Sequence, residues 1–234
     1  MEFPRLIAHR GLHNDKIPEN SVPAFIAAVK GGYGIELDVR FTADYRIVVF
    51  HDKTLERMCG IEGRVSDFTY EQLCCFTLKN TNQKIPLLSE VLKAVDGKAS
   101  LLIEIKEDCP TLEMYRRLSR LMKNYNGIWA VQSFNPFAVL WFRLFSKETP
   151  RGMLISEFEA TKDFKHFLRY LCSFPIVWKL IAAPDFINCD LRSISFKQIE
   201  QAFNAGCGLM SWTAKGKELI DEALKFSDNV IFDI

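Results

Sequence analysis

The chain alternates short, β-branched runs with longer amphipathic stretches along its whole length, and this alternation constrains the fold more than any other feature. In the longer stretches apolar residues recur every three or four positions, which is typical of helices. The strand-like runs lie at 6–10, 34–39, 101–106, 128–133, 152–156, 186–190, 208–213 and 229–233. Eight such units in 234 residues predict a closed (β/α)8 barrel of the TIM type, with 1–234 forming a single domain.

A ninth strand-like run, at 46–52, interrupts this alternation. Only four residues separate it from the preceding run, too few for the right-handed crossover helix that joins parallel strands. We therefore expect it to fold back as an antiparallel hairpin arm above the barrel. A four-residue turn would pair Phe41 with Arg46 and, in the same register, Glu36 with His51.

Two segments stand outside the pattern. The mixed, glycine-containing segment at about 53–85 predicts a small inserted cap, followed by an amphipathic helix at 87–95. The most apolar window, 167–183, contains two basic residues and a proline, so we expect two short helices there and no membrane span.

Charge and cysteine content exclude several classes of protein. The formal net charge is +1 and no basic run occurs, which disfavours a nucleic-acid partner. The seven cysteines are odd in number and form no C-x-x-C pair, which favours reduced thiols. The first residues leave no room for a signal peptide. We therefore expect a cytoplasmic protein without stable membrane insertion, and the oligomeric state stays open.

Acidic residues occupy strand positions that would otherwise be apolar. Glu36 and Asp38 are two apart on one strand and therefore share a face, as do Glu104 and Lys106 on the next barrel strand. Three carboxylates pointing inward at the mouth of a barrel would repel one another unless a cation neutralises their charge. Salt-bridged rim residues are the alternative, but convergence of all three favours an oxygen-ligand site for Mg²⁺ or Ca²⁺ over zinc.

Two of the four histidines end strands beside this cluster. His9 ends the first strand and His51 ends the hairpin arm, so the two imidazoles could serve as general acid and general base. Arg10 offers a planar fork suited to phosphate, and Lys106 adds a point charge. The remaining histidines are expected at the surface: His13 and His166.

These residues lie in short motifs that follow one another along the chain. They are AHRG (8–11), PENS (18–21), ELDV (36–39), VVFHD (48–52), the run at 54–73, IPLLSEVL (85–92), IEIK (103–106), QSF (132–134) and SWT (211–213). In these motifs and their order the chain resembles the glycerophosphodiester phosphodiesterases. The resemblance implies a TIM-type barrel that hydrolyses a glycerophosphodiester to sn-glycerol 3-phosphate and an alcohol, with a place in lipid and glycerol metabolism.

The resemblance also implies residue roles. One divalent cation, Mg²⁺ or Ca²⁺, would be bound by Glu36, Asp38 and Glu104. His9 and His51 would form the acid–base pair.

Further roles follow for the residues around these. Arg10 and Lys106 would hold the phosphate. Glu19 and Asn20 would stand behind the site and orient the residues of the first strand.

The mouth carries two aromatic residues and two departures from the family pattern. Phe134 and Trp212 end strands there and could contact a glycerol face or a choline cation, although core packing is an equal alternative for Phe134. Lys215 stands where many relatives carry Asn, and Phe232–Asp233 replaces the usual Thr-Asp-Pro. We expect both departures to affect the alcohol end of the substrate and to leave the metal and acid–base residues untouched.

Parts of the same pattern also fit other functions. A lysophospholipid or another lipid-linked diester could use the same site, with the apolar segment at 174–182 against an acyl chain. A non-catalytic phosphate-binding barrel is disfavoured because every catalytic position is filled. A magnesium enolase-type barrel would need a third carboxylate on a separate strand and a lysine base on another, and here two ligands share one strand. The alcohol, the metal, the attacking group and the assignment of acid and base stay open.

Overall fold

The computed structural model describes residues 3–106, 111–156, 182–192 and 206–234. Eight parallel strands run in the order β1-β9-β8-β7-β6-β5-β4-β2, and β1 also pairs with β2, so the sheet closes. The strands are β1 (Leu6–Ala8), β2 (Gly34–Phe41), β4 (Leu101–Ile105), β5 (Trp129–Ser133), β6 (Arg151–Ile155), β7 (Phe186–Asp190), β8 (Gly208–Lys215) and β9 (Asn229–Asp233). This confirms the predicted (β/α)8 barrel.

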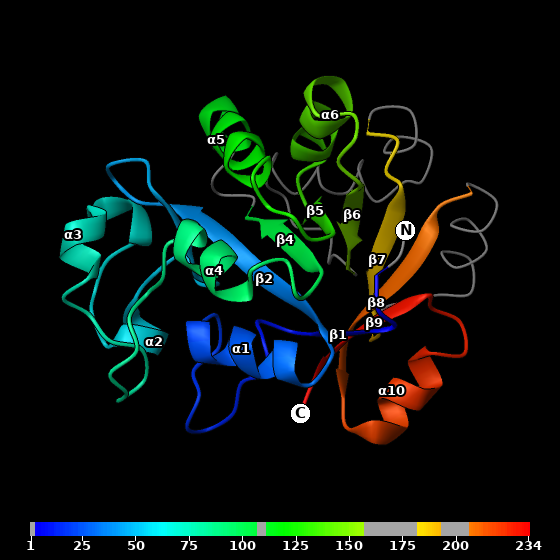
Figure 1. The fold of residues 1–234 in the computed structure, drawn as a ribbon, viewed down its shortest axis with the longest axis horizontal. Helices are drawn as coiled ribbons and strands as arrows, with labels where there is room; N and C mark the ends of the chain where they lie inside the picture. The colour runs from blue at the N-terminus through cyan, green and yellow to red at the C-terminus, as the bar shows by residue number, and fades with distance from the viewer. Residues whose placement is uncertain (1–2, 107–110, 157–181, 193–205) are drawn as a thin grey trace, which may run out of the picture.

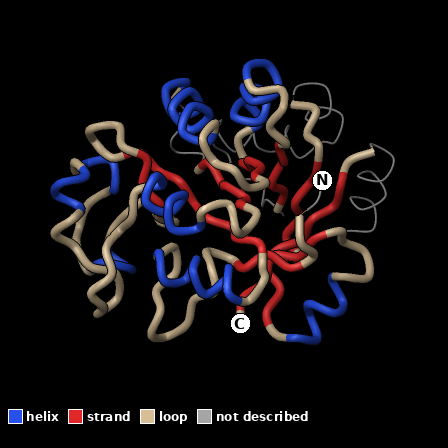
Figure 2. Tube along the Cα trace, in the orientation of Figure 1, coloured by secondary structure: helices blue, strands red, loops and turns tan. Residues whose placement is uncertain are grey.

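Helices surround the strands (Figures 1 and 2). The barrel helices in the described part are α1 (Val22–Lys30), α4 (Leu88–Val95), α5 (Leu112–Met122), α6 (Pro136–Phe145) and α10 (Lys217–Ala223). The alternate residues Ile35, Leu37 and Val39 of β2 are fully buried in one apolar cluster with Phe25 of α1 and Leu88 of α4. Burial of this outward face leaves the other face of β2 to the barrel interior. Of the two short helices expected within 167–183, residues 167–181 lie outside the described residues, as do residues 196–205 of the amphipathic stretch after β7.

The hairpin arm is β3 (Ile47–Val49), which pairs antiparallel with β2 as predicted. The predicted register is wrong by one residue, because Phe41 pairs with Ile47 and not with Arg46. The Thr42 N–H donates to the Arg46 carbonyl at 3.1 Å, so only three residues form the loop. The last of them, Tyr45, takes a left-handed conformation with φ 58°, as is common in three-residue hairpin loops. The one-residue shift also means that Glu36 does not pair with His51.

The segment after the arm forms the predicted insertion and appears as a separate lobe at the left of Figure 1. It contains α2 (Glu56–Cys59), the short 3-10 helix Val65–Asp67 and α3 (Tyr70–Leu73). Its buried apolar residues form a cluster with Val48 and Phe50 of the arm and with Leu87 before α4; the members from the insertion are Leu55, Met58, Val65, Leu73, Leu78 and Ile85. The insertion, hereafter the cap, is therefore held by a small core of its own. The assignment of 1–234 to one domain stays a prediction.

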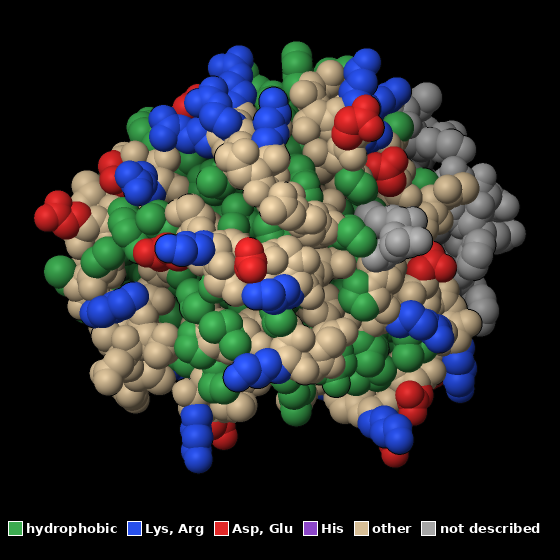
Figure 3. Space-filling view, in the orientation of Figure 1, with side chains coloured by type: hydrophobic (Ala, Val, Ile, Leu, Met, Phe, Trp, Pro, Cys, Tyr) green, Lys and Arg blue, Asp and Glu red, His purple; other side chains and the backbone are tan. Residues whose placement is uncertain are grey.

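Among the described residues, none of the helices has the length and apolar character needed to cross a bilayer. Lys and Arg side chains gather at the top of the face in Figure 3. Helix α5, which carries Arg116, Arg117 and Arg120, lies in that region (Figure 1). The expected absence of a nucleic-acid partner stays a prediction.

Candidate functional site

The site forms where two strands meet on one edge of β2. Strand β4 occupies one edge of β2 from Ile35 to Val39, so β1 and β3 must share the other edge. Strand β1 ends opposite Ile35, and β3 approaches from the opposite direction, with the Phe50 N–H donating to the Asp38 carbonyl at 2.9 Å. The residues that follow these two strand ends, His9 and His51, therefore reach the same place.

Both histidines line one cleft at this point, with about 380 Å³ of free space that is open to solvent. Its lining is His9, Arg10, Glu36, His51, Glu104, Lys106, Gln132, Phe134, Leu154, Trp212 and Ile231. This brings together the two predicted acid–base residues, both predicted phosphate ligands, two of the predicted metal ligands and both mouth aromatics.

Glu36, Asp38 and Glu104 converge as the strand alternation predicts, with one ligand oxygen of each within 4.8 Å of the others. All three side chains are at most 12 % exposed. The Lys106 ammonium lies 2.7 Å from Asp38 Oδ1 and 2.6 Å from Glu104 Oε1. Burial, followed by the neighbouring charges of Asp38 and Glu104, raises the pKa of Glu36 well above its ordinary value.

The donor set fits a hard divalent cation. Three carboxylates offer oxygen ligands of the kind that Mg²⁺ and Ca²⁺ prefer. Asp38 Oδ1 is buried and accepts no hydrogen bond in the described part of the chain, although Lys106 lies close to it. Burial opposes ionisation of Asp38, but Lys106, His51 and Arg10 outweigh it and hold the pKa of Asp38 well below its ordinary value. Asp38 is therefore an ionised carboxylate with oxygen lone pairs that a cation could use.

A strained turn after β1 carries Arg10. Arg10 has φ 54° and Gly11 has φ 79°, both in the left-handed region. A Cβ atom on Gly11 would lie 2.9 Å from Ala24, so only glycine fits where this turn packs on α1. The turn directs the backbone N–H of Arg10 to Glu36 Oε2, to which it donates a hydrogen bond at 3.0 Å. Within the described residues, the buried Arg10 Nε has no hydrogen-bond partner, so it has an N–H available for an anion.

The PEN motif holds the site from behind, in part as predicted. Glu19 accepts a hydrogen bond from Arg10 Nη1 at 2.8 Å and so supports the residue after the first strand. Asn20 supports the same residue through its backbone, because its N–H donates to the Arg10 carbonyl at 2.9 Å. Its Nδ2 donates to Asp38 Oδ2 on β2 at 2.7 Å, because its left-handed backbone, with φ 53°, brings the side chain to β2.

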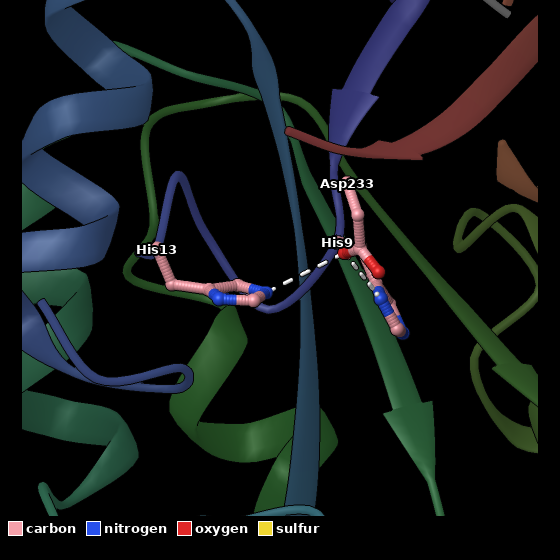
Figure 4. A group of neighbouring side chains, drawn as sticks. All are labelled: His9, His13 and Asp233. Carbon is pink, nitrogen blue, oxygen red and sulfur yellow. Dashed lines mark hydrogen bonds and ion pairs between the residues drawn. The ribbon is translucent and has the colours of Figure 1, made fainter. Parts of the chain in front are cut away.

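His9 is held by the end of the last strand (Figure 4). Its Nδ1 lies 2.9 Å from Asp233 Oδ1, and His13 Nε2 lies 3.4 Å from the same oxygen. Burial opposes ionisation of Asp233, but His13 and His9 outweigh it and hold the pKa of Asp233 below its ordinary value. The ionised carboxylate can only accept, so His9 donates from Nδ1 and its Nε2 is the nitrogen able to exchange a proton.

These contacts correct one expectation and leave another open. Asp233, which contacts His9 directly, is the retained residue of the usual Thr-Asp-Pro, and the departures are Phe232 and Ile234. Their expected effect on the alcohol end of the substrate stays a prediction.

His13 is not a solitary surface residue, since its side chain is only 26 % exposed and shares Asp233. His166 lies outside the described residues. Lys215 is largely exposed, with its Nζ 3.7 Å from Asp233 Oδ2.

His51 is held by its own neighbour in sequence. His51 Nδ1 lies 2.6 Å from Asp52 Oδ1, and the Arg40 guanidinium donates twice to the His51 carbonyl. Asp52 in turn accepts from Arg57 of the cap. The sequence reasoning missed Asp52, Arg57 and Asp233 as partners of the histidines, although Asp52 and Arg57 lie within quoted motifs.

Phe134 and Trp212 face each other across the mouth. Their ring centroids are 6.0 Å apart and their planes meet at 80°. Both are half-buried and line the cleft, so Phe134 is not simply part of the core. The Trp212 Nε1–H donates to the Asn188 carbonyl at 3.3 Å, which orients the indole.

The barrel and the residues at its mouth define a hydrolase of phosphoric diesters. The model of the glycerophosphoryl diester phosphodiesterase family matches residues 9–231, and the chain belongs to this family. This confirms the predicted enzyme, a glycerophosphodiester phosphodiesterase.

Individual relatives agree with this assignment. A glycerophosphodiester phosphodiesterase of Caldanaerobacter subterraneus is 30% identical over 97% of this chain and 93% of the relative. A human lysophospholipase D is 34% identical over 51% of this chain and 41% of its own length. The fold is that of an Oleispira antarctica phosphodiesterase solved in complex with the product sn-glycerol-3-phosphate, with TM-score 0.80, 20% identity and coverage of 99% and 93%.

Proposed function

We propose that this enzyme hydrolyses a glycerophosphodiester with one divalent cation, Mg²⁺ or Ca²⁺, and two histidines. The observation that carries the proposal is the meeting of both histidines with the carboxylate cluster in a single cleft. Carboxylates without a cation would repel a phosphodiester, so the cluster by itself is a poor anion site.

Glu36, Asp38 and Glu104 would hold the cation, which when bound neutralises charge on the phosphate oxygens. Arg10 and Lys106 add two fixed cations at the same place. The unused Nε–H of Arg10 is suited to a phosphate oxygen, and Lys106 lines the cleft with its ammonium beside Asp38 and Glu104. Together they orient the diester and stabilise charge that develops on it.

His9 and His51 would move the protons. Each donates from Nδ1 to a carboxylate, so each exchanges a proton at Nε2. One ring, protonated, gives its Nε2 proton to the leaving alkoxide, and the other, neutral, accepts a proton from the attacking hydroxyl. The rate should therefore follow a bell-shaped pH profile whose limbs belong to the pair.

The decisive experiment measures sn-glycerol 3-phosphate release from several glycerophosphodiesters with Mg²⁺, with Ca²⁺ and with EDTA. Glu104→Gln keeps the size of the side chain and removes one anionic ligand, so metal-dependent release should be lost while the circular dichroism spectrum is unchanged. Glu113→Gln, an exposed residue of α5, is the matched control. Full activity in EDTA, or in Glu104→Gln, would contradict the metal site.

The second candidate is a lysophospholipase D-type activity on a lipid-linked diester at the same site. The similarity of half the chain to a human lysophospholipase D supports it, as do the two aromatic rings at the mouth. Assaying lysophosphatidylcholine beside glycerophosphocholine separates the two candidates. Only a lysophospholipase D-type activity would release choline from lysophosphatidylcholine and leave an acylated glycerol phosphate. Of the predicted acyl contact at 174–182, residues 174–181 lie outside the described residues, and Ala182 is buried.

We also propose a cytoplasmic enzyme of lipid and glycerol metabolism. The free thiols in the described part of the chain include Cys59, Cys74, Cys75 and Cys189, and they support a reducing compartment. Fractionation of cells that express the chain tests the location.

A further inference from the structure

One guanidinium of the cap holds both carboxylates that stand behind the site. Arg57 donates from Nε and Nη2 to Asp52, at 2.5 and 3.0 Å, and from Nη1 and Nη2 to Glu19, at 2.9 and 2.6 Å. Asp52 accepts from His51, and Glu19 accepts from Arg10. Two chains of hydrogen bonds therefore run from a single side chain to a proposed acid–base residue and a proposed phosphate ligand.

The backbone of Arg57 is fixed by the cap's own core. Its neighbours Leu55 and Met58 are at most 2 % exposed within the apolar cluster of the cap. The Lys79 N–H donates to the Met58 carbonyl at 2.7 Å, and α2 ends at Gly60 with a left-handed φ of 68°. The cap core and these end contacts set the position from which the Arg57 side chain reaches the barrel.

The charges around Arg57 keep both carboxylates able to accept. Burial opposes ionisation of Glu19, but Arg57 and Arg10 outweigh it and lower the pKa of Glu19 to about 2. Burial likewise opposes ionisation of Asp52, and His51 with Arg57 outweighs it. Arginine presents donors in a planar fork that matches carboxylates in pairs, which lysine cannot reproduce.

We propose that Arg57 is a positioning residue that couples the cap to the site, orienting His51 through Asp52 and Arg10 through Glu19. The inference rests on the proposed roles of His51 and Arg10. Arg57 itself does not line the cleft in the described structure, so it acts through these two residues.

The two chains of hydrogen bonds predict a separation of kinetic constants. Asp52→Asn breaks the chain to the acid–base residue and should lower kcat with little change in KM. Glu19→Gln breaks the chain to the phosphate ligand and should mainly raise KM. Arg57→Lys loses both chains, so kcat should fall about 10- to 100-fold and KM should rise as well. Arg64→Lys, an exposed arginine of the same cap, is the matched control.

Added guanidinium chloride gives a second readout. In Arg57→Ala the guanidinium ion should restore part of kcat, whereas sodium chloride at the same ionic strength should not. Thermal unfolding of each variant shows whether the cap is intact. If Arg57→Lys or Arg57→Ala does not fold, Asp52→Asn and Glu19→Gln decide. A loss of kcat in Asp52→Asn together with a rise of KM in Glu19→Gln supports the inference. The same change of kcat and KM in both variants overturns it.

His51→Ala, assayed beside these variants, separates this inference from the proposed function. If His51→Ala loses activity while Arg57→Lys keeps both constants, only the positioning role of Arg57 is wrong. If His51→Ala keeps its rate, the proposed acid–base function is wrong.

Discussion

The two histidines of the cleft have the same local chemistry but depend on different parts of the molecule. The partner of His9 is Asp233, 224 residues away on the last barrel strand, and it is shared with His13. The partner of His51 is the next residue, Asp52, which is braced by the cap. The environment of His9 therefore depends on closure of the barrel, and that of His51 depends on an inserted segment.

The two surroundings also differ in exposure. The side chain of His9 is 18 % exposed and that of His51 is 33 % exposed. The cap side is the more open one, so its hydrogen bonds need the extra support that a bidentate arginine provides. Perturbing the cap should consequently affect one histidine and leave the other in place.

The largest expected effect separates the two rings by role. His9→Ala and His51→Ala should each lower kcat by about two to four powers of ten, because each removes one proton transfer. A nitrophenyl phosphodiester, whose leaving group needs little protonation, should partly rescue the variant that lacks the acid and not the one that lacks the base. Near-normal turnover of a natural glycerophosphodiester by both variants would refute the acid–base pair.

The next effect separates the two carboxylates. Asp233→Asn and Asp52→Asn should each lower kcat about 10- to 100-fold, because each releases a histidine from a charged acceptor. Combined with Arg57→Lys, the loss from Asp52→Asn should be far from additive, since both act on His51. The loss from Asp233→Asn should add to that of Arg57→Lys, and kcat of the double variants measures this. If the losses of kcat were equally additive in both double variants, the distinction between the environments of His9 and His51 would be wrong.

A smaller effect concerns stability on the cap side. Glu19 has a pKa lowered to about 2 from 4.5, so its ionic contacts stabilise the folded state above about pH 4.5 and this contribution is lost as pH falls through 2. Glu19→Gln should therefore lower the free energy of unfolding by on the order of 3 kcal/mol at pH 7. In urea titrations, the difference in free energy of unfolding between the wild type and Glu19→Gln should shrink as pH falls from 4.5 to 2. A difference in free energy of unfolding that does not change with pH would mean that Glu19 stabilises the fold by packing and not by its charge.

The smallest effect concerns the barrel side. His13 lies 3.4 Å from Asp233 and is partly exposed, so this pair contributes about 0–1 kcal/mol. His13→Gln should therefore change kcat by no more than about 5-fold. A loss as large as that of His9→Ala would make His13 part of the chemistry and not merely a neighbour of Asp233.

Much of the site could be predicted because it depends on local periodicity. The two-residue alternation of a strand placed Glu36 and Asp38 on one face, and the same rule placed Glu104 beside them. The short connection before β3 predicted an antiparallel arm, since no crossover fits it. The register could not be predicted in this way. Whether Tyr45 adopts φ 58° and leaves a three-residue loop depends on the folded hairpin.

The sequence by itself determined the barrel, the family and the inward carboxylates, because each follows from spacing within a few residues or from short motifs. Only the tertiary structure decided that Asp233 supports His9, that Asn20 reaches Asp38 and that Arg57 joins two carboxylates. Apart from the Arg57–Asp52 pair, these contacts join residues 18 to 224 positions apart, so no strand or helix periodicity encodes them. Their distances depend on how the barrel closes and where the cap packs, and a shift of one residue would separate the partners.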